Sequence, residues 1–284
     1  MADVPARPGW TPLPRALARA THLGPTVAVT TVATLLGSVG GVPAGRLVLL
    51  CAAVLAGQAS IGWSNDWLDA DRDRVVARAD KPVVQGAVRP ATLRWAALAA
   101  AATAVVLSLL LGVVPAGLLL TLVASGWAYN AGLKRTAASG LPYLTGFGAL
   151  PAGVVAAAPG TPLAPWWLVG AGAALGGVAH LANVAPDLED DLATGVRGLP
   201  HRLGPRISAV VGAALLGAAS LALVFGPPGP ATVTGWVSLT VAVPAVVLAI
   251  LGGTGRFRRA AFPAVMLLTV LDVLLLLVGG AAVS

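Results

Sequence analysis

The chain has 284 residues, of which 57% are hydrophobic and only 10% are charged, and it carries a formal net charge of +7. Its mean hydropathy is +0.86. A soluble domain is about one-quarter charged, so this chain lacks the polar surface that a soluble globular protein needs. The single cysteine, Cys51, excludes an intramolecular disulfide. We therefore expect a helical membrane protein that crosses the bilayer several times.

Nine apolar segments follow one another along the chain, separated by turn residues and charges. They span about residues 22–40, 47–68, 91–112, 115–133, 139–158, 164–187, 207–225, 231–252 and 261–281. Several approach the roughly 20 residues that a helix needs to cross a bilayer. Membrane helices tolerate the glycines and prolines inside some of them. The sequence thus predicts an all-α integral membrane protein with nine transmembrane helices, forming one domain over residues 1–284.

The basic residues predict the orientation in the membrane. All 18 except Arg46 lie in the N-terminal segment or close after the second, fourth, sixth and eighth apolar segments. Positively charged loops tend to stay in the cytoplasm. We therefore expect the N-terminus and these loops on the cytoplasmic side of the cell membrane, and the C-terminus on the opposite side. The basic excess then reflects topology and attraction to the lipid bilayer, and it indicates no nucleic-acid partner.

The scarce acidic residues are concentrated in two clusters at the cytoplasmic edge. Of the 11, all but Asp3 and Asp272 follow the second segment (Asp66, Asp69, Asp71, Asp73 and Asp80) or the sixth (Asp187, Glu189, Asp190 and Asp191). Asp272 is alone inside the ninth segment. An intramembrane acid is costly, so Asp272 is either functional or a protonated partner of a neighbouring helix.

The two clusters share one spacing pattern, N-x-x-x-D-x-x-x-D. The first copy is Asn65, Asp69 and Asp73, and the second, 118 residues later, is Asn183, Asp187 and Asp191. A P-x-x-x-G pair follows each copy at the same offset (Pro82 and Gly86; Pro200 and Gly204). These matches predict a duplicated four-helix unit, residues about 22–133 and 139–252, with a ninth helix at about 261–281. In membrane proteins built from repeats, function often lies at the repeat interface.

A spacing of four places the side chains of each copy on one helical face. Two facing acidic stripes repel each other unless cations lie between them, and carboxylate oxygens suit Mg²⁺. Neither copy contains His or Cys, which argues against zinc. Basic residues lie nearby in the chain: Arg72, Arg74, Arg78, Lys81, Lys134, Arg135, Arg197 and Arg202. Carboxylates, Mg²⁺ and basic groups together suit a diphosphate. Since the membrane can hold an apolar tail, we expect an isoprenyl diphosphate.

The segment NDWLDADRD resembles the NDxxDxxxD signature of the UbiA superfamily of intramembrane prenyltransferases. The segment NVAPDLEDD is similar to the second Asp-rich motif of that superfamily. YNAGLKRT resembles the family's sequence between the two motifs, and GVRGLPHRLG the sequence that follows the second. The resemblance covers nearly the whole chain. It implies nine helices around a central cavity, with a cap formed by cytoplasmic loops.

The resemblance, together with the repeat, also implies roles for individual residues. Metal ligands would be Asn65, Asp66, Asp69, Asp73, Asn183, Asp187 and Asp191, with Mg²⁺ as the cofactor. Arg78, Lys81, Lys134 and Arg135 would bind the diphosphate. Asp69, Asp187, Lys134 and Tyr129 would be catalytic. The chain departs from the family at Lys81-Pro82, where Arg-Pro is common, and by carrying Pro186, Glu189 and Asp190 in the second motif. The additional acids leave open which carboxylates bind the metal.

Five further residues are expected to line the cavity for the prenyl chain: Gln58, Trp67, Tyr143, Phe147 and His180. Gln58 lies seven residues before Asn65, and His180 lies three before Asn183, so each shares a helical face with its motif. Aromatic rings can stabilise a carbocation. The alternatives are interfacial packing for the aromatic residues and an interhelical hydrogen bond for Gln58 or His180.

The expected reaction is Mg²⁺-dependent ionisation of an isoprenyl diphosphate and transfer of the prenyl group to an acceptor, such as an aromatic quinone precursor. The alternative is a UbiA-type terpene cyclase, in which a double bond of the same chain attacks the cation and no acceptor is needed. A third class, a non-catalytic transporter or lipid-binding protein, would not need paired acidic motifs.

Overall fold

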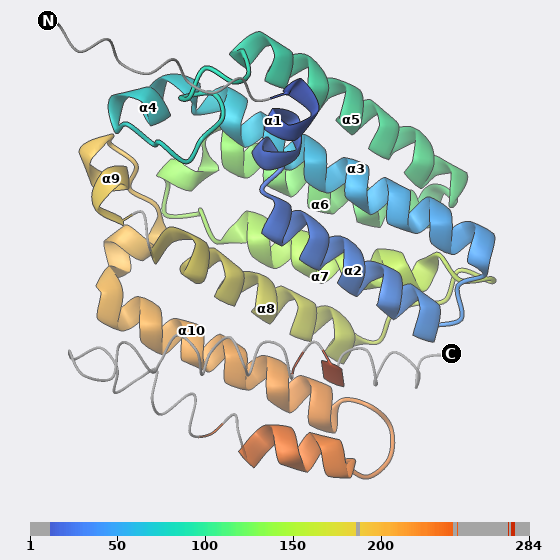
Figure 1. Cartoon of the computed structure of the whole chain (residues 1–284). Helices are drawn as coiled ribbons and strands as arrows, with labels where there is room; N and C mark the ends of the chain where they lie inside the picture. Colours follow the sequence, from blue (N-terminus) through green and yellow to red (C-terminus); the bar gives the residue numbers. More distant parts are fainter. Residues whose placement is uncertain (1–11, 186–187, 241–242, 244–271, 273, 276–284) are drawn as a thin grey trace, which may run out of the picture.

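The computed structural model describes residues 12–185, 188–240, 243, 272 and 274–275, and every regular element in this part is helical (Figure 1). The helices are α1 (Leu13–Ala20), α2 (Leu23–Val39), α3 (Ala44–Leu68), α4 (Ala70–Val75), α5 (Pro90–Leu110), α6 (Val113–Ala131), α7 (Leu141–Ala156), α8 (Trp166–Val184), α9 (Leu188–Ala193) and α10 (Leu199–Phe225). A 3-10 turn, η1 (Leu133–Arg135), lies between α6 and α7. The predicted all-α class is confirmed for this part of the chain.

Within the described residues, five helices are long and apolar enough to cross a membrane: α3, α5, α6, α8 and α10. Helices α1 and α2 together could form a sixth span, broken by a bend of 68°. Helix α7 is apolar but has only 16 residues. Each of the first seven predicted segments overlaps one of these helices. The eighth segment lies partly, and the ninth almost wholly, outside the described residues, so the count of nine stays a prediction.

The helix that covers the seventh segment begins earlier than the sequence predicted. We expected it from about residue 207, but α10 begins at Leu199 and is kinked. The kink falls at Gly204, whose φ of 75° lies in the left-handed region, and Pro205 follows it. Glycine adopts a positive φ without steric cost, and proline removes a backbone donor. The first turn of α10 is therefore set apart from the rest of the helix.

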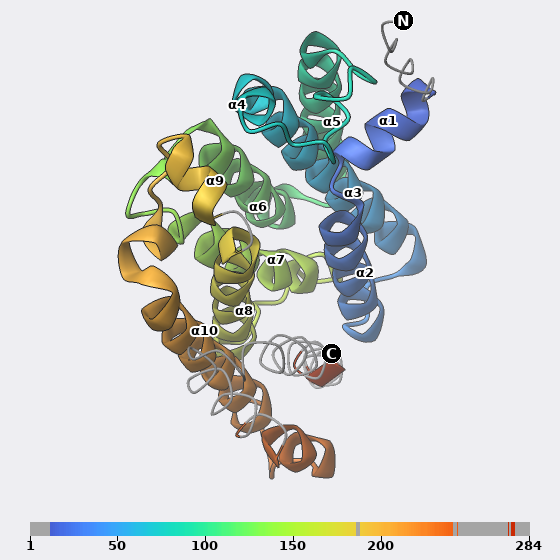
Figure 2. The same cartoon turned by 60° about the vertical axis from the view of Figure 1, so that its left-hand side comes forward.

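The long helices lie side by side in a bundle, and α4 and α9 lie together at one end of it (Figures 1 and 2). Helix α3 packs against α2, α5 and α6, while α7 packs against α6 and α8, and α10 packs on α8. Each acidic motif begins at the end of a long helix, α3 or α8, and continues into a short one, α4 or α9. Both motifs are thereby brought to the same end of the bundle.

Arg46, the basic residue that departs from the charge pattern, has a structural role. Its Nε donates a hydrogen bond to the carbonyl of Ala157 (2.7 Å), and one of its terminal nitrogens donates to the carbonyl of Leu111 (2.5 Å). These two residues are the C-caps of α7 and α5. A cation at a helix C-terminus satisfies its last carbonyls and complements its dipole. Arg46 thus ties two helix ends together.

Helices α7 and α8 approach each other closely because glycines of α8 face α7. A Cβ atom on Gly176 would lie 2.4 Å from the carbonyl oxygen of Tyr143, and one on Gly172 would lie 2.5 Å from that of Phe147. Small residues allow this close approach between membrane helices. The contact fixes the backbone at Tyr143 and Phe147, two of the predicted cavity residues.

We predict that Gly176→Ala destabilises the protein by about 1–3 kcal/mol, because the added methyl group forces α7 and α8 apart. Gly170→Ala, on the exposed side of the same helix, is the matched control, since nothing lies within 4 Å of its Cβ position. Thermal unfolding of the purified protein in detergent measures both. Equal unfolding temperatures for the two variants would contradict the close packing.

Candidate active site

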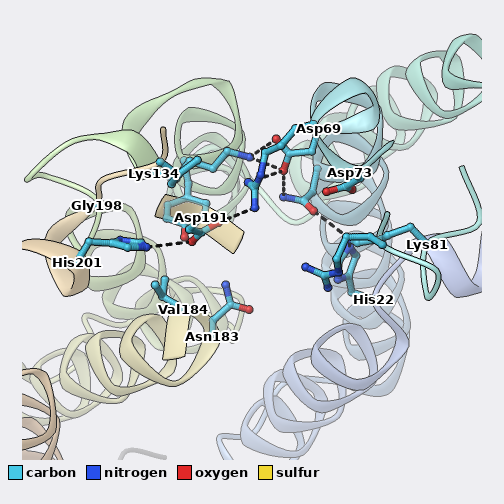
Figure 3. Close-up of a pocket in the computed structure, with 15 residues that line it drawn as sticks. His22, Asp69, Asp73, Lys81, Lys134, Asn183, Val184, Asp191, Gly198 and His201 are labelled. Carbon is cyan, nitrogen blue, oxygen red and sulfur yellow. Dashed lines mark hydrogen bonds and ion pairs between the residues drawn. The ribbon is translucent and has the colours of Figure 1, made fainter. Parts of the chain in front are cut away.

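A polar pocket of about 160 Å³ lies at the end of the bundle where the two acidic motifs meet (Figure 3). It is lined by His22, Asn65, Asp69, Arg72, Asp73, Arg78, Lys81, Tyr129, Lys134, Asn183, Val184, Asp191, Val196, Gly198 and His201. Asp69, Asp73 and Lys81 lie on one side, and Asp191 and His201 lie on the other. The structure therefore brings together residues from both copies of the repeat, as the shared spacing predicted.

The first motif does not lie on one continuous helix. Helix α3 ends at Leu68, and Asp69 is both its C-cap and the N-cap of α4. Backbone hydrogen bonds from Asp69 N to Asn65 O (2.9 Å) and from Asp73 N to Asp69 O (2.8 Å) preserve the spacing of four across this junction. All three side chains of the motif consequently line the pocket.

Lys134 binds Asp69 directly. Its Nζ lies 2.5 Å from both carboxylate oxygens, and its side chain is only 5% exposed. Helix α6 stops at Ala131, and the η1 turn that follows Gly132 directs Lys134 inward. Burial lowers the pKa of Lys134, and the Asp69 carboxylate opposes that effect. The ammonium is held ready for an anionic ligand in the pocket.

Arg72 connects the two motifs. It donates a hydrogen bond to Asp191 Oδ1 at 2.5 Å, and its other terminal nitrogen lies 3.8 Å from Asp69 Oδ2. On the opposite side of Asp191, His201 Nε2 lies 3.4 Å from Oδ2. From the sequence, Arg72 counted among the basic residues near the motifs without an assigned partner, and His201 was not singled out. The signal for Arg72 was its position three residues after Asp69, which places both on one side of a helix.

Asp73 is a buried carboxylate that the surrounding described residues satisfy only in part. Its side chain is buried, and its Oδ2 has no hydrogen-bond partner among the described residues. Burial raises the pKa of Asp73, Lys81 lowers it and Asp69 raises it further. An orphaned buried carboxylate oxygen is an appropriate ligand for a hard cation. Asp73 therefore fits a metal site.

The oxygen donors of the pocket suit Mg²⁺ in their chemistry. They are the carboxylates of Asp69, Asp73 and Asp191 and the amide oxygens of Asn65 and Asn183. Within the described residues, no three His, Cys, Asp or Glu side chains come close enough to hold a metal ion by themselves. The predicted ligand Asp187 lies outside the described residues. The donors present thus fit a metal that binds together with a phosphate-bearing substrate, which would supply further oxygens.

Asp66 has a different position from the other predicted ligands. It is almost fully buried, and it accepts hydrogen bonds from Lys81 Nζ (2.6 Å) and His22 Nε2 (2.9 Å). It does not line the polar pocket, whereas its two partners do. Asp66 therefore orients Lys81 and His22. His22 has a left-handed backbone (φ 58°) at the bend between α1 and α2, a conformation that is uncommon outside glycine and often found at functional sites.

The predicted diphosphate-binding residues divide into two groups. Arg78, Lys81 and Lys134 line the polar pocket. Arg135 is exposed and lines neither pocket. Arg78 also holds Asp80, with its Nε 3.0 Å from Oδ1, and this pairing lowers the pKa of Asp80. The cationic face of the pocket is thus formed by three of the four predicted residues together with Arg72.

A second pocket, of about 170 Å³, adjoins the first and is mainly apolar. The two share four lining residues: His22, Asn65, Tyr129 and Asn183. Gln58, Tyr143 and Phe147 line the second pocket, as the sequence predicted. The Tyr143 ring is stacked parallel to Phe147 at 6.1 Å and meets Tyr129 edge-on at 5.2 Å. An apolar pocket with an aromatic wall therefore begins where the polar pocket ends.

Two predicted cavity residues lie outside both pockets. Trp67 packs edge-on against Trp127 at 6.5 Å. His180 is buried behind the aromatic wall, with its ring 5.0 Å from Tyr143 and 5.8 Å from Tyr129. Its Nε2 lies 3.1 Å from the hydroxyl of Ser139. His180 contacts the wall of the cavity from behind, where it supports the two tyrosines.

A model of the UbiA prenyltransferase family matches residues 26–281 of the chain. The chain belongs to this family. The match extends over most of the sequence, so the resemblance carried by the two acidic motifs is confirmed. No curated protein matches the chain.

Solved UbiA structures share the fold of this protein. A UbiA homologue from Archaeoglobus fulgidus bound to GPP and Mg²⁺ has a TM-score of 0.70 at 12% identity, covering 94% of this chain and 99% of its own. An apo UbiA homologue from Aeropyrum pernix K1 has a TM-score of 0.68 at 22% identity, covering 91% and 96%. A digeranylgeranylglyceryl phosphate synthase has a TM-score of 0.68 at 14% identity, covering 95% and 99%. At these identities the similarity establishes the fold.

We predict that Arg72→Leu destabilises this UbiA protein by about 3 kcal/mol, because it leaves the buried Asp191 carboxylate without its main cation. Arg74→Leu, on the same helix, is the control. Arg74 pairs with Asp71 at the same distance of 2.5 Å, but both side chains are exposed, and exposed pairs contribute at most about 1 kcal/mol. Thermal unfolding in detergent without ligands compares the variants. Similar losses at both positions would show that Arg72 does not stabilise the junction of the motifs.

Proposed function

We propose that the protein binds an isoprenyl diphosphate at the junction of the two pockets, ionises it with the help of Mg²⁺, and transfers the prenyl group to an acceptor. The observation that supports this most directly is the contact of a polar pocket with an apolar one, which share His22, Asn65, Tyr129 and Asn183. A diphosphate joined to a hydrocarbon chain is likewise polar at one end and apolar at the other. Structural relatives bound to GPP and Mg²⁺, or to DMAPP and Mg²⁺, agree with this ligand class.

The proposed metal ligands are Asn65, Asp69, Asp73, Asn183 and Asp191, with Asp187 from the part of the chain that is not described. When bound, Mg²⁺ neutralises the diphosphate and makes it a better leaving group. Asp66, which the sequence analysis placed with the ligands, is proposed to anchor Lys81. Its two hydrogen bonds hold the ammonium beside the pocket.

The cationic side chains of the pocket are proposed to hold the diphosphate. Lys134, Lys81, Arg78 and Arg72 all line it, and charge-assisted hydrogen bonds from Arg and Lys to phosphate oxygens are strong. They stabilise the negative charge that develops when the allylic carbon–oxygen bond breaks and the electron pair leaves with the diphosphate. Two of these cations already contact proposed metal ligands, since Lys134 binds Asp69 and Arg72 binds Asp191.

The allylic cation is proposed to form at the edge of the aromatic wall. Tyr129 lines both pockets, so its ring lies beside the reacting carbon. The π faces of Tyr129, Tyr143 and Phe147 can stabilise positive charge, and the apolar lining excludes water. An aromatic acceptor forms a carbon–carbon bond with the cation and then passes the ring proton to the released diphosphate, which restores aromaticity. Diphosphate and a prenylated acceptor are the products.

A terpene cyclase would use the same ionisation and capture the cation with a double bond of its own chain. The feature that favours this alternative is the lining of the apolar pocket, which among the described residues contains no Lys, Arg, Asp or Glu. A pocket of this kind suits a hydrocarbon alone as well as an uncharged acceptor. The two functions differ in whether the product depends on an added acceptor.

We further propose the complete predicted topology, with nine spans, a cytoplasmic N-terminus and active-site cap, and a C-terminus on the other side of the cell membrane. Supporting this, α4 and α9 lie at one end of the bundle (Figure 1), and residues of the two acidic motifs line the polar pocket. In both halves of the chain a long helix is followed by a short one, α3 by α4 and α8 by α9, and this repeated order supports the duplicated unit.

We predict that Asp73→Asn and Asp191→Asn each lower Mg²⁺-dependent release of diphosphate from a prenyl diphosphate by a factor on the order of 10². Each change removes a charge from the pocket and preserves shape. Asp71→Asn is the control, since the Asp71 side chain is 98% exposed and lies outside the pocket. Diphosphate release from purified protein is measured with a coupled assay. Wild-type rates in both pocket variants would refute the proposed site.

Incubation with geranyl, farnesyl or geranylgeranyl diphosphate and Mg²⁺ separates the two functions. For a transferase, we expect prenylated product only when an aromatic acceptor is added, because only the acceptor supplies the attacking carbon. Products with and without acceptor are identified by mass spectrometry, with Mg²⁺ removed by chelation as the control. A cyclic hydrocarbon or terpene alcohol formed in good yield without acceptor would exclude the transferase in favour of the cyclase.

A further inference from the structure

Gln58 is an unusual residue in the apolar pocket. It lines this pocket on α3, and it is only 9% exposed. Its side-chain amide makes no hydrogen bond with any other described residue. The amide atoms of Gln58 are not among the fully buried, unpartnered side-chain atoms of the described residues, so a molecule in the pocket can reach them. Polar side chains in such buried surroundings nearly always have a hydrogen-bond partner. We therefore expect the hydrogen-bond partner of the Gln58 amide to be a polar group of a bound molecule.

Two other polar side chains of the pocket, Asn130 and Thr26, are already engaged in hydrogen bonds within the protein. Asn130 Nδ2 donates to Ile61 O (2.9 Å) and to Ser64 Oγ (2.8 Å). The Thr26 hydroxyl donates to Thr21 O (2.7 Å). These groups stabilise the helices around the pocket. Gln58 differs from Asn130 and Thr26 because its amide makes no hydrogen bond with another described residue.

The charge of the lining restricts what this pocket can hold. His22 is the only His, Lys, Arg, Asp or Glu among the described residues that line it, and its Nε2 is held by Asp66. A carboxylate or sulfonate bound beside Gln58 would be buried without a counter-ion, at a high desolvation cost. A neutral hydroxyl or carbonyl oxygen would satisfy the amide without that cost.

The place of Gln58 separates it from the diphosphate. It lies seven residues before Asn65 on the same face of α3, which is two helical turns or about 10 Å. Tyr143 and Phe147, which are stacked in parallel, line the same pocket. A flat aromatic ring can pack on them and reach Gln58 with a polar substituent.

We propose that Gln58 hydrogen-bonds a neutral hydroxyl of an uncharged aromatic second substrate, a phenol, and thereby selects it over acidic aromatics. This inference rests on the proposed function, because it concerns the acceptor of that reaction. The acceptor class is then a hydroxylated ring without a carboxylate. Gln58 determines specificity through binding and takes no part in breaking the diphosphate bond.

The test compares binding of three ligands to the full-length protein in detergent by equilibrium dialysis. The ligands are 4-propylphenol, propylbenzene, which lacks the hydroxyl, and 4-hydroxybenzoate, which adds the charge. The wild type should bind 4-propylphenol about tenfold more tightly than propylbenzene, from one hydrogen bond to a buried amide, and should bind 4-hydroxybenzoate more weakly than 4-propylphenol.

Two substitutions change the recognising group in opposite ways. Gln58→Leu should bind 4-propylphenol and propylbenzene equally. Gln58→Arg should reverse the preference in favour of 4-hydroxybenzoate, because it provides the missing cation. Leu55→Val, on an exposed part of the same helix, is the control and should behave as the wild type. Thermal unfolding checks that each variant is folded. If Gln58→Arg does not fold, the comparison of Gln58→Leu with the wild type is enough to test the proposal.

The inference is overturned if the wild type prefers 4-hydroxybenzoate, or if Gln58→Leu still distinguishes the phenol from propylbenzene. Mg²⁺-dependent release of diphosphate by the wild type is measured in parallel, with and without a saturating aromatic acceptor. Its absence under both conditions would refute the proposed function, while the binding results would still show whether Gln58 recognises a neutral phenol. Water can also capture the cation and give a prenyl alcohol. If a saturating concentration of 4-propylphenol binds the protein but leaves the rate of alcohol formation unchanged, the assignment of the apolar pocket to an acceptor is overturned.

Discussion

The pairing of buried carboxylates with buried cations is the interaction on which the active-site end of this protein depends. Asp66 binds Lys81, Asp69 binds Lys134, and Asp191 binds Arg72. An unpaired charge at these depths would cost several kilocalories per mole. Each cation comes from a different segment from its carboxylate, so the pairs bring the end of α3, the loop before α5, the η1 turn, α4 and α9 together. The shape of the pocket follows from these requirements.

The same pairs separate polar from apolar space. Charged groups are confined to the end of the bundle because they must be near one another, and the helices behind them present Gln58, Tyr143 and Phe147 to a mainly apolar pocket. The boundary passes through Asn65 and Tyr129, which line both spaces. A substrate with a charged head and a hydrocarbon chain is therefore bound in one orientation, with its reacting carbon at the boundary.

The sequence predicted the helical class, a helix in each of the first six apolar segments and the meeting of the two motifs. The meeting could be predicted because the spacing of four survives the break at Asp69. The sequence could not predict side chains whose direction depends on local irregularity. The η1 turn sends Lys134 into the pocket and leaves the adjacent Arg135 in solvent. His22 reaches the site through a left-handed backbone at a 68° bend. Such turns arise from packing between helices, which hydrophobic periodicity does not encode.

The chemistry of a carbocation also explains which polar groups an apolar pocket of this kind can tolerate. An unprotonated amine or a free hydroxyl next to the cation would itself be alkylated, and loosely held water would convert the cation to an alcohol. Thr26 and Asn130 are engaged in hydrogen bonds within the protein. An amide is a weak base and a weak nucleophile, yet it both donates and accepts hydrogen bonds. Glutamine at position 58 can thus orient a second substrate without competing with it for the cation.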